Sequence, residues 1–169
     1  LQIIHNGLIT LPGTATFTNV ESIFVSNVQH QSLDFSGLSG VPIIILDSGT
    51  TIDGSTIDIG LGPNQYLILN SIKDGDISAA SLADGGIRIT QDATIDSLDL
   101  RLDDVGPNTS IANESVFVDV AGASVSTANI KNINTSFITI SNTGGALAKV
   151  NLEGSGTLGL TINTPAEIN

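Results

Sequence analysis

The sequence predicts an all-β protein, a parallel β-solenoid of about seven irregular coils that each use about 20 to 25 residues. Three observations favour this fold class: a composition suited to strands, short runs in which apolar and polar residues alternate, and brief connections rich in turn-forming residues. No window has the 3.6-residue periodicity of an amphipathic helix. An antiparallel β-sandwich is the alternative fold.

The composition limits how a core can be built. The 169 residues contain no Cys, Met or Trp, and only five Phe and one Tyr are aromatic. Ile and Val are abundant, and Thr adds further β-branched side chains. Such side chains favour strands, so we expect a layered core of Ile, Leu and Val.

The β-like runs follow one another along the whole chain, and many of them place apolar residues on one face and polar residues on the other. The segment Leu98-Asp99-Leu100-Arg101-Leu102 is one example, and Val116-Phe117-Val118-Asp119-Val120 is another. The expected strands cover residues 15–19, 22–26, 32–35, 41–46, 57–60, 65–70, 77–79, 86–90, 93–102, 115–120, 125–133, 137–141, 149–152 and 158–162.

The connections between these runs separate the two all-β folds. A sandwich of hairpins needs repeated two-residue turns, and Asp53-Gly54 and Asp74-Gly75 are of that type. Most of the corners are not, and Gly62-Pro63-Asn64 is typical of them. Short strands, polar corners and few aromatic residues fit a solenoid better.

Domain organisation and charge restrict the function further. Residues 1–169 are expected to form one β-solenoid domain that belongs to a larger chain. The formal net charge of −12 would repel the phosphate backbone, so we expect no nucleic-acid partner. No apolar stretch approaches the roughly 18 residues of a membrane span, so we expect no membrane insertion.

The excess of Asp over Glu indicates calcium, because Asp presents hard oxygen ligands on a short stem near tight turns. Two clusters are the candidate metal ligands. Asp74 and Asp76 flank Gly75 and share one side of an extended chain, whereas Asp99, Asp103 and Asp104 surround the end of one expected strand. Ordinary solvated acidic turns are the alternative interpretation of both clusters.

The sequence favours a protein without catalytic activity. There is no Gly-x-Ser-x-Gly motif and no Cys nucleophile, and neither His5 nor His30 belongs to a recognisable motif. Polysaccharide lyases and hydrolases also use β-solenoids, and they need basic or acidic groups on neighbouring coils. Arg101 lies within the segment from Asp99 to Asp104, and this pairing of a basic residue with nearby carboxylates is the only combination of interest for such chemistry.

Two neighbouring segments near the beginning of the sequence carry a resemblance. The segments Phe17-Thr18-Asn19-Val20-Glu21-Ser22-Ile23-Phe24-Val25 and Leu33-Asp34-Phe35-Ser36-Gly37-Leu38-Ser39-Gly40-Val41 resemble a unit of bacterial surface-layer proteins and repeats-in-toxin adhesins. The resemblance implies secretion to the bacterial cell surface, self-association in a lattice, and use of calcium. The chain departs from the family because the glycine-aspartate nonapeptide of its calcium-filled rungs is not present in tandem.

Two hypotheses for the function follow. The first is a self-assembling structural scaffold of a bacterial cell-surface layer, stabilised by calcium. The second is a solenoid that binds or cleaves carbohydrate, such as an adhesin, a tail-spike segment or a lyase, with cell-surface polysaccharide as its partner. A groove lined by aromatic, acidic and basic groups would favour the second. The scarcity of aromatic and cationic residues favours the first.

Overall fold

The fold is all-β and entirely parallel in the part of the chain that is described. The computed structural model describes residues 2–4, 15–26, 28, 32–47, 51–52, 56–74, 86–106 and 115–169. Within these ranges there is no helix, and each strand pairing is parallel. The prediction of a parallel β-solenoid is confirmed, and the alternative of an antiparallel sandwich is wrong.

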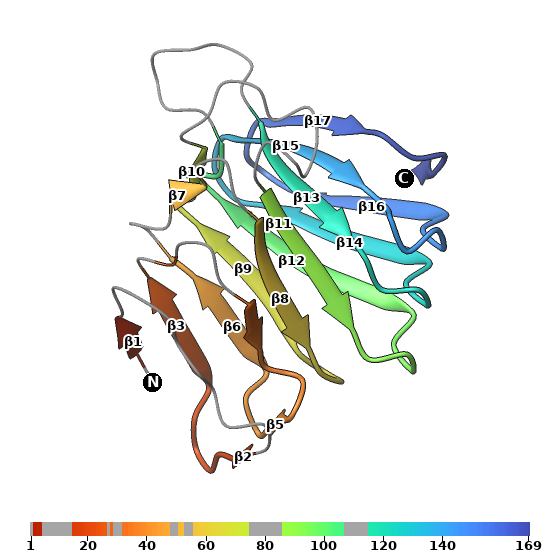
Figure 1. The fold of residues 1–169 in the computed structure, drawn as a ribbon. Coiled ribbons are helices and arrows are strands. Elements are labelled where there is room, and N and C mark those ends of the chain that lie inside the picture. Colours follow the sequence, from red (N-terminus) through yellow and green to blue (C-terminus); the bar gives the residue numbers. More distant parts are fainter. Residues whose placement is uncertain are drawn as a thin grey trace.

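The larger sheet, which we call sheet A, contains eight strands that are neighbours in the order of the sequence (Figure 1). These strands are β1 (Gln2–Ile4), β3 (Ser22–Ser26), β6 (Ile43–Leu46), β9 (Tyr66–Asn70), β12 (Ser97–Asp103), β14 (Thr127–Asn132), β16 (Lys149–Gly154) and β18 (Glu167–Ile168).

The second sheet, sheet B, contains six strands that alternate along the chain with those of sheet A. They are β4 (Ser32–Asp34), β8 (Thr56–Leu61), β11 (Gly86–Gln91), β13 (Val116–Val120), β15 (Ser136–Ser141) and β17 (Leu158–Ile162). Two short parallel pairs complete the described strands: β2 (Ala15–Thr16) with β5 (Leu38–Ser39), and β7 (Thr51–Ile52) with β10 (Lys73–Asp74).

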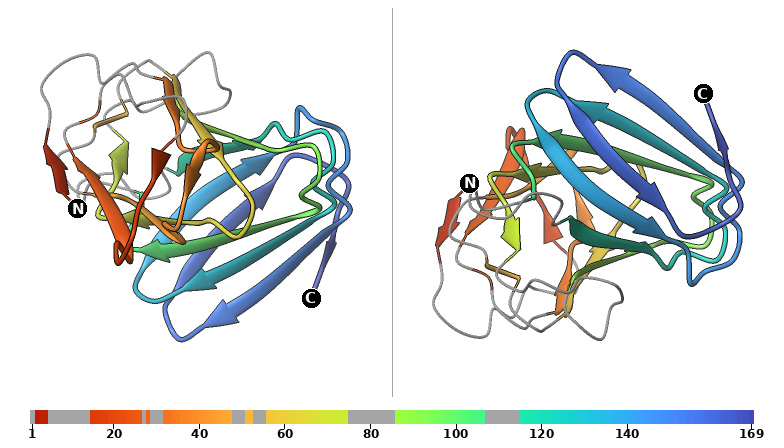
Figure 2. Two further views of the ribbon diagram at one scale, coloured as in Figure 1. Left: turned by 90° about the horizontal axis from the view of Figure 1, so that it is seen from below. Right: turned by 90° about the horizontal axis from the view of Figure 1, so that it is seen from above.

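The chain winds from sheet A to sheet B and back, so that each coil lies on the preceding one. The two termini lie at opposite ends of this stack (Figures 1 and 2). The coils differ in length. Asn129 and Asn151 of adjacent coils are 22 residues apart in the sequence, whereas Asp99 and Asn129 are 30 residues apart. The longer coils exceed the predicted length of about 20 to 25 residues.

The core is a stack of aliphatic side chains between the two sheets. In sheet B, Ile57, Ile87, Val118 and Ile140 lie opposite one another in successive coils, and each is at most 1% exposed. This arrangement follows from the sequence, because side chains alternate across a strand and the parallel register brings equivalent positions together. Burial of such rows is the main stabilising contribution to the fold.

A buried glutamine connects two corners of adjacent coils. The Gln65 side chain accepts a hydrogen bond from the Gly62 backbone N–H at 2.8 Å and donates to the carbonyl oxygens of Phe35 and Leu38 at 3.1 Å each. Asn64, in the turn before Gln65, has a φ of 62°. The predicted corner at Gly62-Pro63-Asn64 is therefore a turn that the interior of the solenoid holds in place.

Several expected strands are shorter than the sequence suggests. The expected strand 93–102 begins only at Ser97, because Asp92 accepts hydrogen bonds from the backbone N–H and the hydroxyl of Thr94 and so holds a turn. The expected strand 15–19 ends at Thr16, and Asn19 has a φ of 61°. The expected strand 77–79 lies outside the described residues.

Candidate functional site

The structure places the predicted metal ligands in three different settings. Asp74 belongs to β10, and the structure does not describe its side chain; Asp76 lies outside the described residues. Asp104 is exposed and follows β12 in a turn, with a φ of 56°. Asp99 and Asp103 both lie on the outer face of β12, where the alternation predicted them.

Asp99 and Asp103 bind amides of the next coil. Asn129 donates from Nδ2 to Oδ1 of Asp99 at 2.7 Å, and Asn134 donates to Oδ1 of Asp103 at 2.6 Å. Four residues of extended chain separate the two carboxylates by about 13 Å, so they cannot be ligands of one ion. Within the described residues, no three Asp, Glu or His side chains come together as a metal site. The calcium site stays a prediction.

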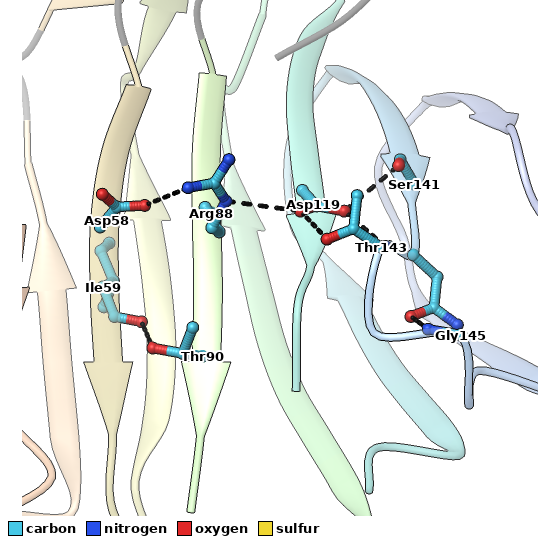
Figure 3. A network of polar contacts seen from close by, with 9 residues as sticks. Asp58, Ile59, Arg88, Thr90, Asp119, Ser141, Thr143 and Gly145 are labelled. Carbon is cyan, nitrogen blue, oxygen red and sulfur yellow. Dashed lines mark hydrogen bonds and ion pairs between the residues drawn. The ribbon is translucent and has the colours of Figure 1, made fainter. Parts of the chain in front are cut away.

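A row of charged and polar side chains crosses the outer face of sheet B (Figure 3). Asp58, Arg88, Asp119 and Ser141 lie opposite one another on β8, β11, β13 and β15. Arg88 lies between the two carboxylates: its Nη1 is 3.3 Å from Oδ1 of Asp58, and its Nε is 3.7 Å from Oδ2 of Asp119. The row therefore joins four successive coils of sheet B.

Asp119 is the buried member of this row. Its side chain is fully buried, whereas those of Asp58 and Arg88 are 41% and 40% exposed. Thr143 donates its backbone N–H to Oδ1 at 2.9 Å and its hydroxyl to Oδ2 at 2.6 Å, and the Ser141 hydroxyl donates to Oδ1 at 3.2 Å. Both carboxylate oxygens thus have partners, as a buried charge requires.

The bonding of this row suits a structural role better than a chemical one. A general acid or base needs a carboxylate that can reach a substrate proton. Asp119 is enclosed by hydroxyl, amide and guanidinium groups, and Arg88 is shared between two acidic residues. Sequence patterns alone did not reveal this row, because its members lie on different coils. Asp58, Arg88 and Asp119 follow one another in the sequence at intervals of about one coil. This regular spacing of an acidic, a basic and an acidic residue is the signal that could have revealed the row.

A second polar surface lies on the outer face of sheet A. A groove of about 660 Å³ runs over β9, β12, β14 and β16. Its outward-facing lining residues are Tyr66, Asp99, Arg101, Asn129, Lys131, Asn151 and Glu153. Arg101, the cation of interest in the sequence, lies in this groove with an Nη2 atom 3.9 Å from Oδ2 of Asp103. The two histidines, His5 and His30, lie outside the described residues.

One exposed carboxylate has a shifted pKa. The backbone N–H of Thr94 donates to Oδ1 of Asp92 at 2.9 Å, and the Thr94 hydroxyl donates to the same oxygen at 2.8 Å. The backbone hydrogen bond first, and then the hydroxyl, hold the pKa of Asp92 below its ordinary value. The shift belongs to a turn of the solenoid and marks no reactive group.

Comparisons with known proteins yield no match to a family model, a curated protein or a solved structure. In the part of the chain that the structure describes, no helix has the length and apolar character to cross a membrane.

Proposed function

We propose that the chain is a structural segment of a secreted bacterial surface scaffold, in which the parallel β-solenoid acts as a stiff assembly unit. The observation that carries the proposal is that the outward polar side chains bind the neighbouring coils. Asp99 accepts from Asn129, Asp103 accepts from Asn134, and Asp119 accepts from Thr143. Side chains used in this way strengthen the contact between coils.

The stacking of the coils also fits a scaffold. In the described residues, each strand of the two large sheets pairs with its neighbours in the stack, so stability adds along the stack and the unit can be extended by repetition. Parallel ladders join the coils on both sheets, with the aliphatic rows between them. The resemblance of Phe17–Val25 and Leu33–Val41 to surface-layer proteins supports the same function and an extracellular location.

Calcium is the ion that we propose for assembly. The chain has 17 acidic and five basic residues, and acidic rods of this kind repel one another unless a cation neutralises them. Asp99 uses one carboxylate oxygen for an amide of the next coil, which leaves the other for an ion, whereas Oδ2 of Asp103 also faces Nη2 of Arg101 at 3.9 Å. Asp74, Asp76 and Asp104 are the other proposed ligands, and Asp99 and Asp103 would belong to different ions.

Sedimentation velocity and electron microscopy with calcium or with a chelator test the scaffold proposal. We expect ordered assemblies in calcium, monomers in the chelator, and weak assembly in magnesium, which demands a compact octahedral site. The double variant Asp103→Asn/Asp104→Asn should assemble less than the unaltered chain, and Asp58→Asn on sheet B is the matched control. Identical monomeric profiles in calcium and chelator would contradict the proposal.

A further inference from the structure

The groove on sheet A is built from two rows of side chains that successive coils supply. The first row contains Tyr66, Asp99, Asn129 and Asn151, and the second contains Arg101, Lys131 and Glu153. Two acidic and two basic residues make this lining formally neutral, although the chain as a whole carries a net charge of −12. The groove is therefore a surface where a ligand without charge meets both donors and acceptors.

The first row has a fixed orientation. Asn129 donates from Nδ2 to Oδ1 of Asp99 at 2.7 Å, and Asn151 donates from Nδ2 to Oδ1 of Asn129 at 2.8 Å. Each amide nitrogen has two hydrogens, so each asparagine keeps one N–H for a ligand. These groups recur at the strand spacing of about 4.8 Å.

The charged side chains of the second row form only weak contacts with one another. Lys131 and Glu153 form an ion pair at 3.1 Å, but their side chains are 52% and 76% exposed, and such pairs contribute little. Arg101 makes only the 3.9 Å contact with Asp103 among the described residues, and its side chain is 42% exposed, so guanidinium N–H groups remain for a ligand. A ligand with hydroxyl groups can take up these donors and acceptors without breaking a strong protein contact.

Tyr66 lines the end of the groove that lies on β9, and the pairing of the following residue, Leu67, with Leu100 puts Tyr66 beside Asp99. It is the only tyrosine of the chain and is half-buried. An aromatic ring offers a flat apolar surface together with a polar hydroxyl. The C–H face of a pyranose ring stacks on such a surface, while the hydroxyl groups at its edge form hydrogen bonds.

We propose that this groove binds an extended segment of a neutral polysaccharide that runs across the strands from β9 to β16. Tyr66 stacks against one sugar ring, and the amides of Asn129 and Asn151 with Arg101 and Lys131 bind hydroxyl groups of the rings that follow. A polyanionic glycan is disfavoured, because the net charge of the chain repels it. This binding activity goes beyond the scaffold function and does not depend on lattice assembly.

An array of neutral and acidic polysaccharides, probed with the intact chain, tests the proposal. We expect retention of at least one neutral polysaccharide and weaker retention of alginate. The hexasaccharide of the retained polymer should then shift the side-chain amide NMR signals of Asn129 and Asn151, with no change at Asn163, an exposed asparagine that follows β17. Retention of no neutral polymer, stronger retention of alginate, or amide shifts only outside sheet A would overturn the proposal.

Variants of groove residues distinguish a loss of sugar stacking from a loss of folding. Tyr66→Ala should weaken binding of that hexasaccharide by about tenfold or more, whereas Tyr66→Phe should keep it within about threefold, since it preserves the ring. Asn151→Ala should weaken binding, and Asn163→Ala is the control that should not. Thermal unfolding of each variant checks the fold. Equal affinities for Tyr66→Ala, Tyr66→Phe and the unaltered chain would contradict the assignment of Tyr66.

Discussion

Thr143 binds both oxygens of Asp119: its backbone N–H lies 2.9 Å from Oδ1 and its hydroxyl 2.6 Å from Oδ2. The turn that follows β15 thereby closes over a carboxylate of β13 and buries it completely. Hydrogen bonds to a buried charge are stronger than those between neutral groups. The contact between these two coils therefore depends on the negative charge at Asp119.

Asp119→Asn should lower the free energy of unfolding by about 1 to 3 kcal/mol, because an amide presents one acceptor where the carboxylate presents two. Asp58→Asn is the matched control on the same row. Its side chain is 41% exposed, and it should cost at most about 1 kcal/mol. Urea unfolding of both variants measures the difference. Equal losses of stability would show that burial of Asp119 does not matter.

Two leucine positions on one inward row of sheet A test the layered core. Leu100 and Leu152 each lie opposite Ile130, on either side of it, but they are 3% and 38% exposed. Leu100→Ala should cost about 2 to 5 kcal/mol, because it leaves a cavity between coils. Leu152→Ala should cost about 1 kcal/mol, since less apolar area is lost. A larger effect at Leu152, by thermal or urea unfolding, would contradict the described packing.

Two glycines with positive φ separate backbone strain from steric overlap. Gly145 has a φ of 79° and open space where a Cβ would lie, so Gly145→Ala should cost about 1 to 2 kcal/mol. Gly154 has a φ of 128°, and its Cβ would overlap the carbonyl oxygen of Asn132. Gly154→Ala should therefore cost about 1 to 3 kcal/mol more than Gly145→Ala. Denaturant midpoints compare the variants, and equal midpoints would exclude the overlap.

The stabilisation that Asp92 contributes to its turn decreases at low pH. Its pKa in the folded state lies below the ordinary value of 3.8, so the stabilisation is fully present above about pH 3.8 and is lost as the pH falls through the folded pKa. Thr94→Ala removes the hydroxyl donor and keeps the backbone donor. An NMR titration of the Asp92 carboxyl should then show a pKa that rises but stays below the ordinary value. An unchanged pKa would remove the hydroxyl as a cause.

Calcium should raise the melting temperature if the acidic clusters bind it. An ion at about 100 times its dissociation constant stabilises the folded state by about 2.7 kcal/mol. Asp74→Asn/Asp76→Asn and Asp103→Asn/Asp104→Asn should each reduce the shift, and Asp58→Asn should not. Superimposable melting curves in calcium and in chelator would contradict calcium binding by these clusters.

The alternation of apolar and polar residues was sufficient to predict the strands and the inward side chains of several of them. In β12, Leu98, Leu100 and Leu102 are buried, as the pattern predicted, and Asp99 and Arg101 face outward. The pattern was less informative for β6, where Ile44 and Ile45 are adjacent in sequence and both are buried. An apolar run leaves the inward face undefined, because period two needs polar residues to identify it.

The sequence could not predict which coils would bring polar residues together. Asp58 meets Arg88 because the coils there are 30 residues long, whereas Asn129 meets Asn151 across 22 residues. The corners differ in length and so set these separations in the sequence. The pattern of a strand does not determine the length of the corner that follows it. Asp119 illustrates the same limit: the alternation predicts an outward position, but burial by Thr143 depends on a turn 24 residues later.

The measurement that tests the solenoid most directly uses the absence of cysteine from the chain. Ser97 lies opposite Thr127, and Thr127 lies opposite Lys149. Neighbouring parallel strands are about 4.8 Å apart, which suits a disulfide, and next-nearest strands are about 9.6 Å apart, which does not. The Ser97→Cys/Thr127→Cys variant should form an intramolecular disulfide under mild oxidation. Formation of the disulfide in Ser97→Cys/Lys149→Cys instead, or in both variants equally, would contradict the stacked parallel coils.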